Sequence, residues 1–280
     1  MPALGNSYVI FYISIAMATP PSISESQLKK FRKLLLKKYR REENLYIIEG
    51  SHLVSEALRS SADVKHVLVS HSYTEQEEFS EIGNLAEQKR ATVFRGKDDQ
   101  IRSLSDTVTA QGIVAIIQRR ETRLTWNASG TREVRVVLDG VSDPGNVGTI
   151  IRTCDWFGVN AVILGEDSTE IENPKVLRAS MGSTFHLPVA HEPDLPSLLA
   201  LAKNNGWTIA VTLPAGGVRP RRDLFAGRCC LILGNEARGI SRELIDLADQ
   251  KLTIPRSGNA ESLNVAVTCG IILAEISESP

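Results

Sequence analysis

In the second half of the chain, short runs of almost uninterrupted apolar residues alternate with helical patterns. The runs are Val134–Leu138, Ala161–Leu164, Trp207–Val211, Cys229–Leu233 and Lys251–Ile254. A strand with one face in water alternates apolar and polar residues, whereas a strand in a parallel sheet is covered by helices on both faces. The pattern therefore predicts an α/β fold built on a parallel sheet.

Polar residues gather where three of these strands pass into helices. The three segments are Asn146–Arg152, Gly234–Gly239 and Ile254–Asn264. In an open α/β sheet, the carboxyl ends of the strands form the binding crevice. We therefore expect these distant segments to build one polar site that carries out chemistry.

The first segment lies in a glycine-containing turn but matches neither common phosphate-binding motif. A Walker loop needs Lys and Ser or Thr after its second glycine, where this chain has Asn146 and Val147, and the close glycine pair of a dinucleotide site is absent. Gly148 has an equally good structural explanation, since glycine permits a tight turn. Arg152, in a helix expected over Val147–Phe157, is either a surface residue or a ligand for anions and hydroxyl groups.

The other two segments also have structural alternatives. Gly234–Gly239 can be an ordinary connection, although a short connection does not account for the carboxylate of Glu236. Ser262 is a candidate N-cap of an apolar helix over Val265–Ile276, whereas Asn264, expected inside its first turn, favours a functional role. That helix is either part of the core or part of a subunit interface.

The first half of the chain predicts a smaller α/β domain. Apolar strand patterns alternate there with helical ones, at Leu45–Ile48, Ser51–Arg59, Val64–Val69 and Gly112–Ile117. A polar, nonperiodic stretch that follows is typical of a linker. We expect a leader, a first domain, a linker and a second domain at residues 1–28, 29–118, 119–132 and 133–280.

The leader contains an apolar run, Tyr8–Ala16, that superficially resembles a signal peptide. No Lys or Arg precedes Lys29, and the run is too short to span a bilayer. We therefore expect a poorly ordered leader, with Met17 as an alternative start, and favour a cytoplasmic protein over a secreted one.

Cysteine and histidine spacing argues against disulfides and metal sites. The cysteines have no CxxC spacing and lie in apolar patterns, and the five histidines form no HxxxH pair. We expect no metal and no membrane partner, and four buried free thiols in a reducing compartment: Cys154, Cys229, Cys230 and Cys269.

A run of basic residues near the N-terminus contains no acidic residue. The net charge of −1, from 32 basic and 33 acidic residues, allows such local segregation. A solvated helix face is the usual explanation of a charge run, whereas phosphate contacts would make RNA binding fall steeply with salt. The candidates for RNA contact are Lys29, Lys30, Lys33, Lys37, Lys38, Arg40 and Arg41.

Taken together with Arg178–Pro188, the three polar segments resemble the SpoU/TrmH family of RNA 2′-O-ribose methyltransferases, members of the SPOUT class. This resemblance covers residues 134–277. The first half resembles the family's RNA-binding extension, through Arg40–Gly50 and Gln111–Ala115. Two other classes fit the sequence less well: an RNA-binding protein without catalysis does not account for the retained polar residues, and a nucleotide-dependent oxidoreductase would need a dinucleotide motif.

The resemblance implies a deep trefoil knot that forms a pocket for S-adenosyl-L-methionine. It also implies that backbone groups hold this cofactor, at the positions Thr212, Leu213, Leu233, Gly234, Gly239, Ile254, Pro255 and Leu263. The expected substrate is structured RNA, with ribosomal RNA favoured over transfer RNA. The expected assembly is a homodimer with the site near the subunit boundary.

The implied reaction transfers a methyl group to a ribose 2′-hydroxyl, which is a poor nucleophile. Because a guanidinium stays protonated at neutral pH, we expect Arg152 to orient RNA phosphate and to stabilise the developing alkoxide rather than to act as a base. The expected positioning residues are Asn146, Glu236, Ser262 and Asn264.

Overall fold

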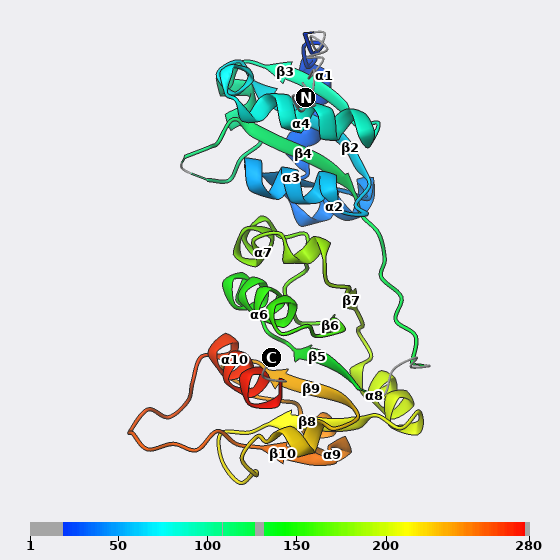
Figure 1. The fold of residues 1–280 in the computed structure, drawn as a ribbon, viewed down its shortest axis with the longest axis vertical. Coiled ribbons are helices and arrows are strands. Elements are labelled where there is room, and N and C mark those ends of the chain that lie inside the picture. The colour runs from blue at the N-terminus through cyan, green and yellow to red at the C-terminus, as the bar shows by residue number, and fades with distance from the viewer. Residues whose placement is uncertain (1–18, 108, 127–131, 278–280) are drawn as a thin grey trace, which may run out of the picture.

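The computed structural model describes residues 19–107, 109–126 and 132–277. These residues form two α/β domains, one above the other along the long axis of the molecule (Figure 1). Helix α7 lies at the boundary between the two domains, and the linker runs along one side. The expected leader up to residue 18 and residues 127–131 of the expected linker lie outside the described residues.

The N-terminal domain is built on a four-stranded mixed sheet in the order β1-β4-β2-β3. Only β2 and β3 are parallel, whereas β4 is antiparallel to both β1 and β2. In chain order the elements are α1 (Glu25–Lys33), α2 (Lys37–Glu43), β1 (Leu45–Glu49), α3 (Ser51–Arg59), β2 (Val64–Ser70), η1 (Tyr73–Glu75), α4 (Glu78–Gln88), β3 (Thr92–Gly96), α5 (Asp98–Arg102) and β4 (Ile113–Gln118).

This domain begins before the expected boundary at residue 28. Ser22 pairs with Arg95 beside β3, and the side chains of Ile23 and Leu28 are buried. Ser24 caps α1, since its hydroxyl accepts from the N–H of Gln27, whose side chain accepts from the N–H of Ser24. Residues 22–28 therefore belong to the folded domain, and the expected leader is too long.

The C-terminal domain contains the parallel sheet that the apolar runs predict. Its six strands are all parallel, in the order β10-β8-β9-β5-β6-β7. In chain order the elements are β5 (Glu133–Asp139), α6 (Pro144–Trp156), β6 (Ala161–Leu164), α7 (Pro174–Ser180), η2 (Ser183–Phe185), β7 (Val189–His191), α8 (Leu195–Asn204), β8 (Thr208–Thr212), η3 (Arg222–Phe225), β9 (Arg228–Gly234), α9 (Arg242–Leu247), β10 (Gln250–Leu252) and α10 (Val265–Ile276).

Helices cover both faces of this sheet, which explains the unbroken apolar strands. Val136 and Leu138 of β5 pack on the face covered by α6 and α10, whereas Val137 packs with α8 and α9 on the other face. Successive residues of a strand point to opposite faces, so both sets must be apolar. The four cysteines are free and buried, as predicted.

The linker is fixed near both of its ends. The Arg119 guanidinium donates to Glu172, and the backbone N–H of Arg119 donates to Asn44. At the other end Trp126 is buried, and the Arg135 guanidinium lies over the rings of Trp126 and Trp207, 4.4 and 4.3 Å from their centroids. Cation–π contacts of this kind are strengthened by exclusion of water.

Candidate active site

The three polar segments meet at one edge of the sheet. They follow β5, β9 and β10, which are parallel and therefore end on the same side. Helix α6 begins at Pro144, three residues earlier than expected, so Asn146 lies in its first turn. Asp143 caps this helix, because its carboxylate accepts from the N–H of Asn146 at 2.8 Å.

Three of the five predicted catalytic residues form a hydrogen-bonded chain. The Asn146 amide donates to Oε1 of Glu236 at 2.8 Å, and the Asn264 amide donates to Oδ1 of Asn146 at 2.9 Å. These residues are separated by 90 and 118 positions in the sequence. The structure therefore brings Asn146, Glu236 and Asn264 together, as expected from the shared edge of the sheet.

Asn264 is the N-cap of α10, and the expected cap, Ser262, is not. The side-chain oxygen of Asn264 accepts from the backbone N–H groups of Ala266 and Val267, at 2.9 and 3.2 Å. Such a cap stabilises a helix by about 1 kcal/mol. Asn264 thus fixes α10 with its oxygen and Asn146 with its nitrogen. Ser262 is exposed in the preceding loop and is not part of the hydrogen-bonded chain.

Asn235 is a positioning residue that the sequence did not single out. Its amide nitrogen donates to the carbonyl of Gly140 at 2.7 Å, and its oxygen accepts from the N–H groups of Ala237 and Arg238. It therefore shapes the loop around Glu236 and ties it to the loop before α6. The position of this Asn, in a turn directly after a strand, could have predicted these contacts, because Asn side chains commonly bond to backbone groups a few residues ahead.

The glycines in these segments are explained by close packing. A side chain at Gly148 would place its Cβ 2.5 Å from Cβ of Ala179 and 2.6 Å from the carbonyl oxygen of Val176, so this glycine lets α6 and α7 approach. A Cβ at Gly234 would lie 2.4 Å from the carbonyl carbon of Gly239. Gly148 therefore serves helix packing rather than a turn, and Gly234 allows its loop to close on the strand end.

Arg152 lies on the same helix as Asn146 but outside the hydrogen-bonded chain. Its side chain is exposed, and six residues of helix separate the two positions by roughly 9 Å along the axis. No hydrogen bond or ion pair joins the side chain of Arg152 to another residue in the described part of the chain. Its guanidinium can therefore turn toward an anionic ligand without first breaking an internal contact.

The predicted cofactor-binding residues, apart from Leu263 just before α10, lie at or shortly after the carboxyl ends of the neighbouring strands β8, β9 and β10. The Leu213 N–H donates to the carbonyl of Leu252 at 2.8 Å, and the Thr212 hydroxyl donates to the carbonyl of Ile232 at 3.1 Å. Gly239 has a φ of +71° and exchanges two backbone hydrogen bonds with Asn235. The remaining members differ in exposure: Leu233 is buried, Ile254 is half-buried, and Pro255 and Leu263 are exposed.

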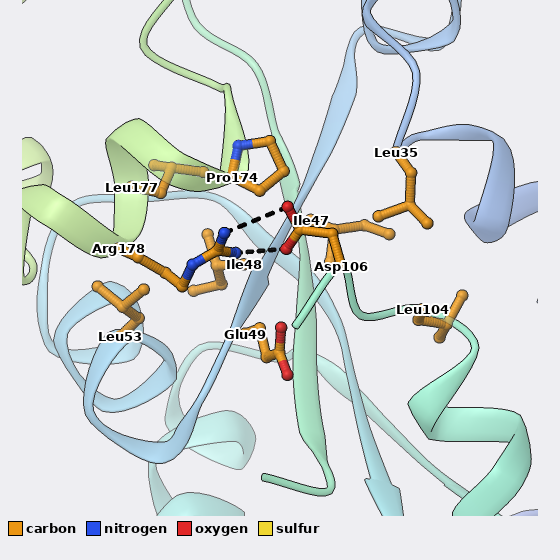
Figure 2. Close-up of a pocket in the computed structure, with 10 residues that line it drawn as sticks. All are labelled: Leu35, Ile47, Ile48, Glu49, Leu53, Leu104, Asp106, Pro174, Leu177 and Arg178. Atoms are coloured by element: carbon orange, nitrogen blue, oxygen red, sulfur yellow. Dashed lines mark hydrogen bonds and ion pairs between the residues drawn. The ribbon is translucent and has the colours of Figure 1, made fainter. Parts of the chain in front are cut away.

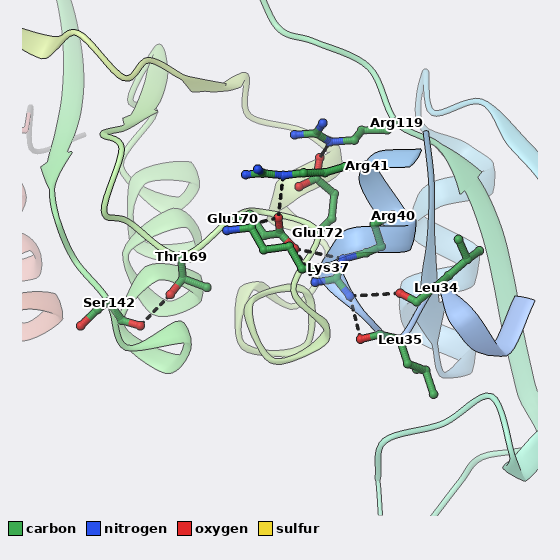
Figure 3. Close-up of polar contacts among 10 residues, drawn as sticks. All are labelled: Leu34, Leu35, Lys37, Arg40, Arg41, Arg119, Ser142, Thr169, Glu170 and Glu172. Carbon is green, nitrogen blue, oxygen red and sulfur yellow. Dashed lines mark hydrogen bonds and ion pairs between the residues drawn. The ribbon is translucent and has the colours of Figure 1, made fainter. Parts of the chain in front are cut away.

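The basic run forms two helices, and one of its predicted RNA contacts is wrong. Arg40 is buried and binds Glu170 and the carbonyls of Leu34 and Leu35 (Figure 3), so its donors are already engaged inside the protein. The other six candidates are exposed: Lys29, Lys30, Lys33, Lys37, Lys38 and Arg41. Two of these basic side chains lie close to acidic residues that follow the run in sequence. Lys30 pairs with Glu43, and Lys38 lies 3.8 Å from Glu42.

Cysteine chemistry and a clustered metal site find no support in the described residues. Burial raises the pKa of Cys230 to about 12 and also raises the pKa values of Cys154 and Cys229, so these thiols stay protonated and unreactive. Within the described ranges no group of three or more His, Cys, Asp or Glu side chains is arranged to hold a metal ion. In the same ranges no helix combines the length and apolar character needed to span a bilayer.

Comparison with known proteins identifies two family domains. Residues 133–274 match the SpoU rRNA methylase family, and residues 25–115 match the MRM3-like substrate-binding domain. A Bacillus subtilis relative, named 23S rRNA (guanosine(2553)-2′-O)-methyltransferase RlmP, is 36% identical over 90% of this chain and 96% of its own length.

Two solved structures have the same fold over nearly the whole chain. An AdoMet-bound rRNA methyltransferase from Sinorhizobium meliloti has a TM-score of 0.81 at 30% identity, covering 91% of this chain and 95% of its own. A TrmH-family protein from Porphyromonas gingivalis, described as a candidate RNA methyltransferase, has a TM-score of 0.76 at 30% identity, covering 91% and 98%.

The fold and the two matched domains thus define a two-domain RNA methyltransferase. The chain belongs to the SpoU rRNA methylase family. This membership confirms the resemblance drawn from the three polar segments and excludes the oxidoreductase alternative.

Proposed function

We propose that this chain methylates a ribose 2′-hydroxyl of ribosomal RNA at the site formed by Asn146, Arg152, Glu236 and Asn264. The hydrogen-bonded chain Glu236–Asn146–Asn264 is the observation that carries the proposal, because it joins three segments at the edge where this fold binds ligands. The B. subtilis relative, whose name specifies 2′-O-methylation of 23S rRNA, supports ribosomal RNA as the substrate. Transfer RNA is the alternative substrate.

The residues at the ends of β8, β9 and β10 fit S-adenosyl-L-methionine. Leu213 and Leu252 bring two strand ends together through their backbones, and the glycine at 234 keeps the adjoining loop free of side-chain bulk. Leu263, whose surface is 48% exposed, adds an apolar contact. A nucleoside held mainly by backbone groups needs this combination. When bound, the cofactor supplies a methyl group carried by a positively charged sulfur.

The chain's own residues orient and activate the ribose hydroxyl. Asn146 is fixed on both sides, so its position is set before RNA arrives. The exposed guanidinium of Arg152 binds the adjacent phosphate and stabilises the oxyanion that develops on the 2′-oxygen. Ser262 lies in the loop leading to Asn264 and positions that loop. Arg256, which donates to the carbonyl of Ala260 at 3.2 Å, is held in the same loop beside the RNA.

The threading of the chain and its assembly are further parts of the proposal. Residues 213–218 run beside β10, with Val218 paired to Leu252 and its N–H donating to Lys251, which supports a trefoil knot around the cofactor site. Trp156 of α6 is 85% exposed and Val267 of α10 is 50% exposed, which supports a homodimer through these helices. The protein acts in the cytoplasm, where ribosomal RNA is its partner.

Mapping of ribose methylation tests the proposed function. Total RNA from cells with and without this gene is digested and analysed by mass spectrometry, and purified protein is incubated with the unmethylated RNA and S-adenosyl-L-methionine. We expect one 2′-O-methylated nucleotide of ribosomal RNA to disappear without the gene and to return after incubation. A methylation lost from transfer RNA instead would favour the alternative substrate, and no loss from either RNA would refute the proposal.

A further inference from the structure

One short segment of the catalytic domain contacts both the loop before Asn146 and the RNA-binding domain. This segment, Ser168–Glu172, follows β6 and leads into α7. Its second residue, Thr169, holds the loop before α6: the Thr169 N–H donates to the carbonyl of Val141 at 3.1 Å, and the Thr169 hydroxyl donates to the carbonyl of Ser142 at 2.6 Å (Figure 3). Asp143, which caps α6 and bonds to Asn146, is the next residue along that loop.

Glu170, the residue after Thr169, points into the RNA-binding domain. Its carboxylate is 8% exposed and accepts from Nε of Arg40 at 3.0 Å and from Nη2 of the same side chain. Nη1 of Arg40 donates to the carbonyls of Leu34 and Leu35, at 3.0 and 2.8 Å. Arg40 thus binds the turn between α1 and α2 with one side of its guanidinium and the catalytic domain with the other.

The same carboxylate faces two of the exposed cations that are candidates for RNA contact. Lys37 Nζ lies 3.8 Å and Arg41 Nε lies 3.9 Å from Oε2 of Glu170. Both side chains are more than half exposed, so phosphate groups can reach them from solvent. The buried pair Arg40–Glu170 holds its place because separating it would leave a charge without a partner in a region shielded from water.

We propose that Thr169 and Glu170 are positioning residues for methyl transfer. They hold the loop that carries Asn146 at a fixed place relative to the basic helices α1 and α2, so that RNA bound by those helices presents its ribose to the active site. The connection from α2 to Asn146 is short because it passes through neighbouring residues. Glu170 binds Arg40 of α2, Thr169 binds Ser142, and Asp143, the residue after Ser142, binds Asn146. The inference rests on the proposed function, because it requires RNA that is bound at one domain and methylated at the other.

A second ion pair joins the domains without touching this path. Arg178 of α7 binds Asp106 in a bidentate pair, with Nη2 and Oδ2 3.2 Å apart, near Ile47 and Ile48 of β1 (Figure 2). This pair is about one-third exposed, and among the described residues no hydrogen bond or ion pair joins its side chains to the loop at Val141–Asp143. Asp106→Asn therefore provides a matched control that weakens the domain interface alone.

The test compares Thr169→Val, Thr169→Ser, Glu170→Gln and Asp106→Asn in the full chain. For each protein, kcat and KM with ribosomal RNA are measured, together with cofactor affinity by calorimetry and the melting temperature. We expect Thr169→Val and Glu170→Gln to lower kcat about tenfold or more, since a misplacement of ~1 Å can cost a factor of about 100. KM for RNA and cofactor affinity should change less than about twofold, because both ligands still bind.

Controls separate positioning from loss of folded protein. Thr169→Ser keeps the hydroxyl and should retain wild-type kcat, Asp106→Asn should do the same, and the double variant Thr169→Val/Glu170→Gln should lose no more than the larger single effect. The inference would be overturned if kcat were unchanged in Thr169→Val, or if it fell equally in Asp106→Asn. It would also be overturned if the fall in kcat equalled the fall in the number of cofactor sites per chain measured by calorimetry, since that result indicates loss of folded protein. If the unmodified chain transfers no methyl group to RNA, the proposed function itself fails, which is a different result.

Discussion

Asn146 and Arg152 lie on one helix but differ in how firmly they are held. Asn146 is bonded to Glu236 on one side and to Asn264 on the other, so its amide is oriented in advance. The side chain of Arg152 is exposed and makes no hydrogen bond or ion pair with the rest of the described chain. A fixed amide suits the positioning of a loop, whereas a free guanidinium suits an anion that arrives with the substrate.

Arg152→Ala should abolish most activity without weakening cofactor binding. We expect kcat to fall by a factor of about 100 to 1000, as it does when one donor to a developing oxyanion is removed. Cofactor affinity, measured by calorimetry, should stay within about twofold, because Arg152 lies on α6 rather than at the ends of β8, β9 and β10. Arg152→Lys keeps the charge and should lose less. Equal losses of rate and of cofactor affinity would contradict the assigned role.

In the catalytic domain, the sequence predicts the strands better than it predicts the residues that cap the helices. Unbroken apolar runs predicted β5, β6, β8, β9 and β10, because strands covered on both faces cannot alternate. Strand β7 was missed because its two apolar residues, Val189 and Ala190, lie between Pro188 and His191 and form no apolar run. The N-cap at Asn264 was misplaced because Ser262 has an equally suitable side chain, and only the fold decides which one meets the helix.

Long-range pairs could not be predicted from local pattern. The run containing Arg40 reads as uniformly basic and exposed, yet its partner Glu170 is 130 residues away. Burial of Arg40 depends on the docking of two domains, which periodicity within α2 does not encode. The link between Asn146 and Glu236 was anticipated for a different reason, since parallel strands place their carboxyl ends together.

Helices α1 and α2 should control the salt dependence of RNA binding. We expect Lys33→Ala/Lys38→Ala to weaken binding and to reduce the slope of log K against log salt concentration by about 1 to 2, because two phosphate contacts are lost. The measurement is a fluorescence-anisotropy titration with an RNA fragment at several salt concentrations. Lys203→Ala, on α8 of the other domain, is the control and should leave the slope unchanged. An unchanged slope in the double variant would remove these helices from the RNA surface.

At the scale of the whole molecule, two of the exposed apolar side chains belong to helices on one side of the catalytic domain. Trp156 and Val267 belong to α6 and α10, which pack on the same face of the sheet. An indole that is 85% exposed gains little from folding of the single chain. The homodimer proposed above would bury this indole against a second copy of the chain.

Trp156→Glu should convert a dimer into a monomer. Because the side chain is exposed, we expect the free energy of unfolding of the single chain to change by only about 0.5 kcal/mol. Sedimentation equilibrium measures the change in mass. Leu201→Glu, at a half-exposed position on α8 across the sheet, is the control and should remain dimeric. A Trp156→Glu protein that still sediments as a dimer would place the interface elsewhere.

The Trp126–Arg135–Trp207 stack limits the length of free chain between the two domains. Arg120 stays with the first domain through Asp63 and Ser61, and the carbonyl of Thr125 accepts from the Arg135 guanidinium of the second, which leaves the four residues Glu121–Leu124 as a tether. Fully stretched, four residues reach about 14 Å. Because the buried Arg40–Glu170 pair also joins the domains, an RNA captured by one domain meets the other at a high local concentration, without a new search through solution.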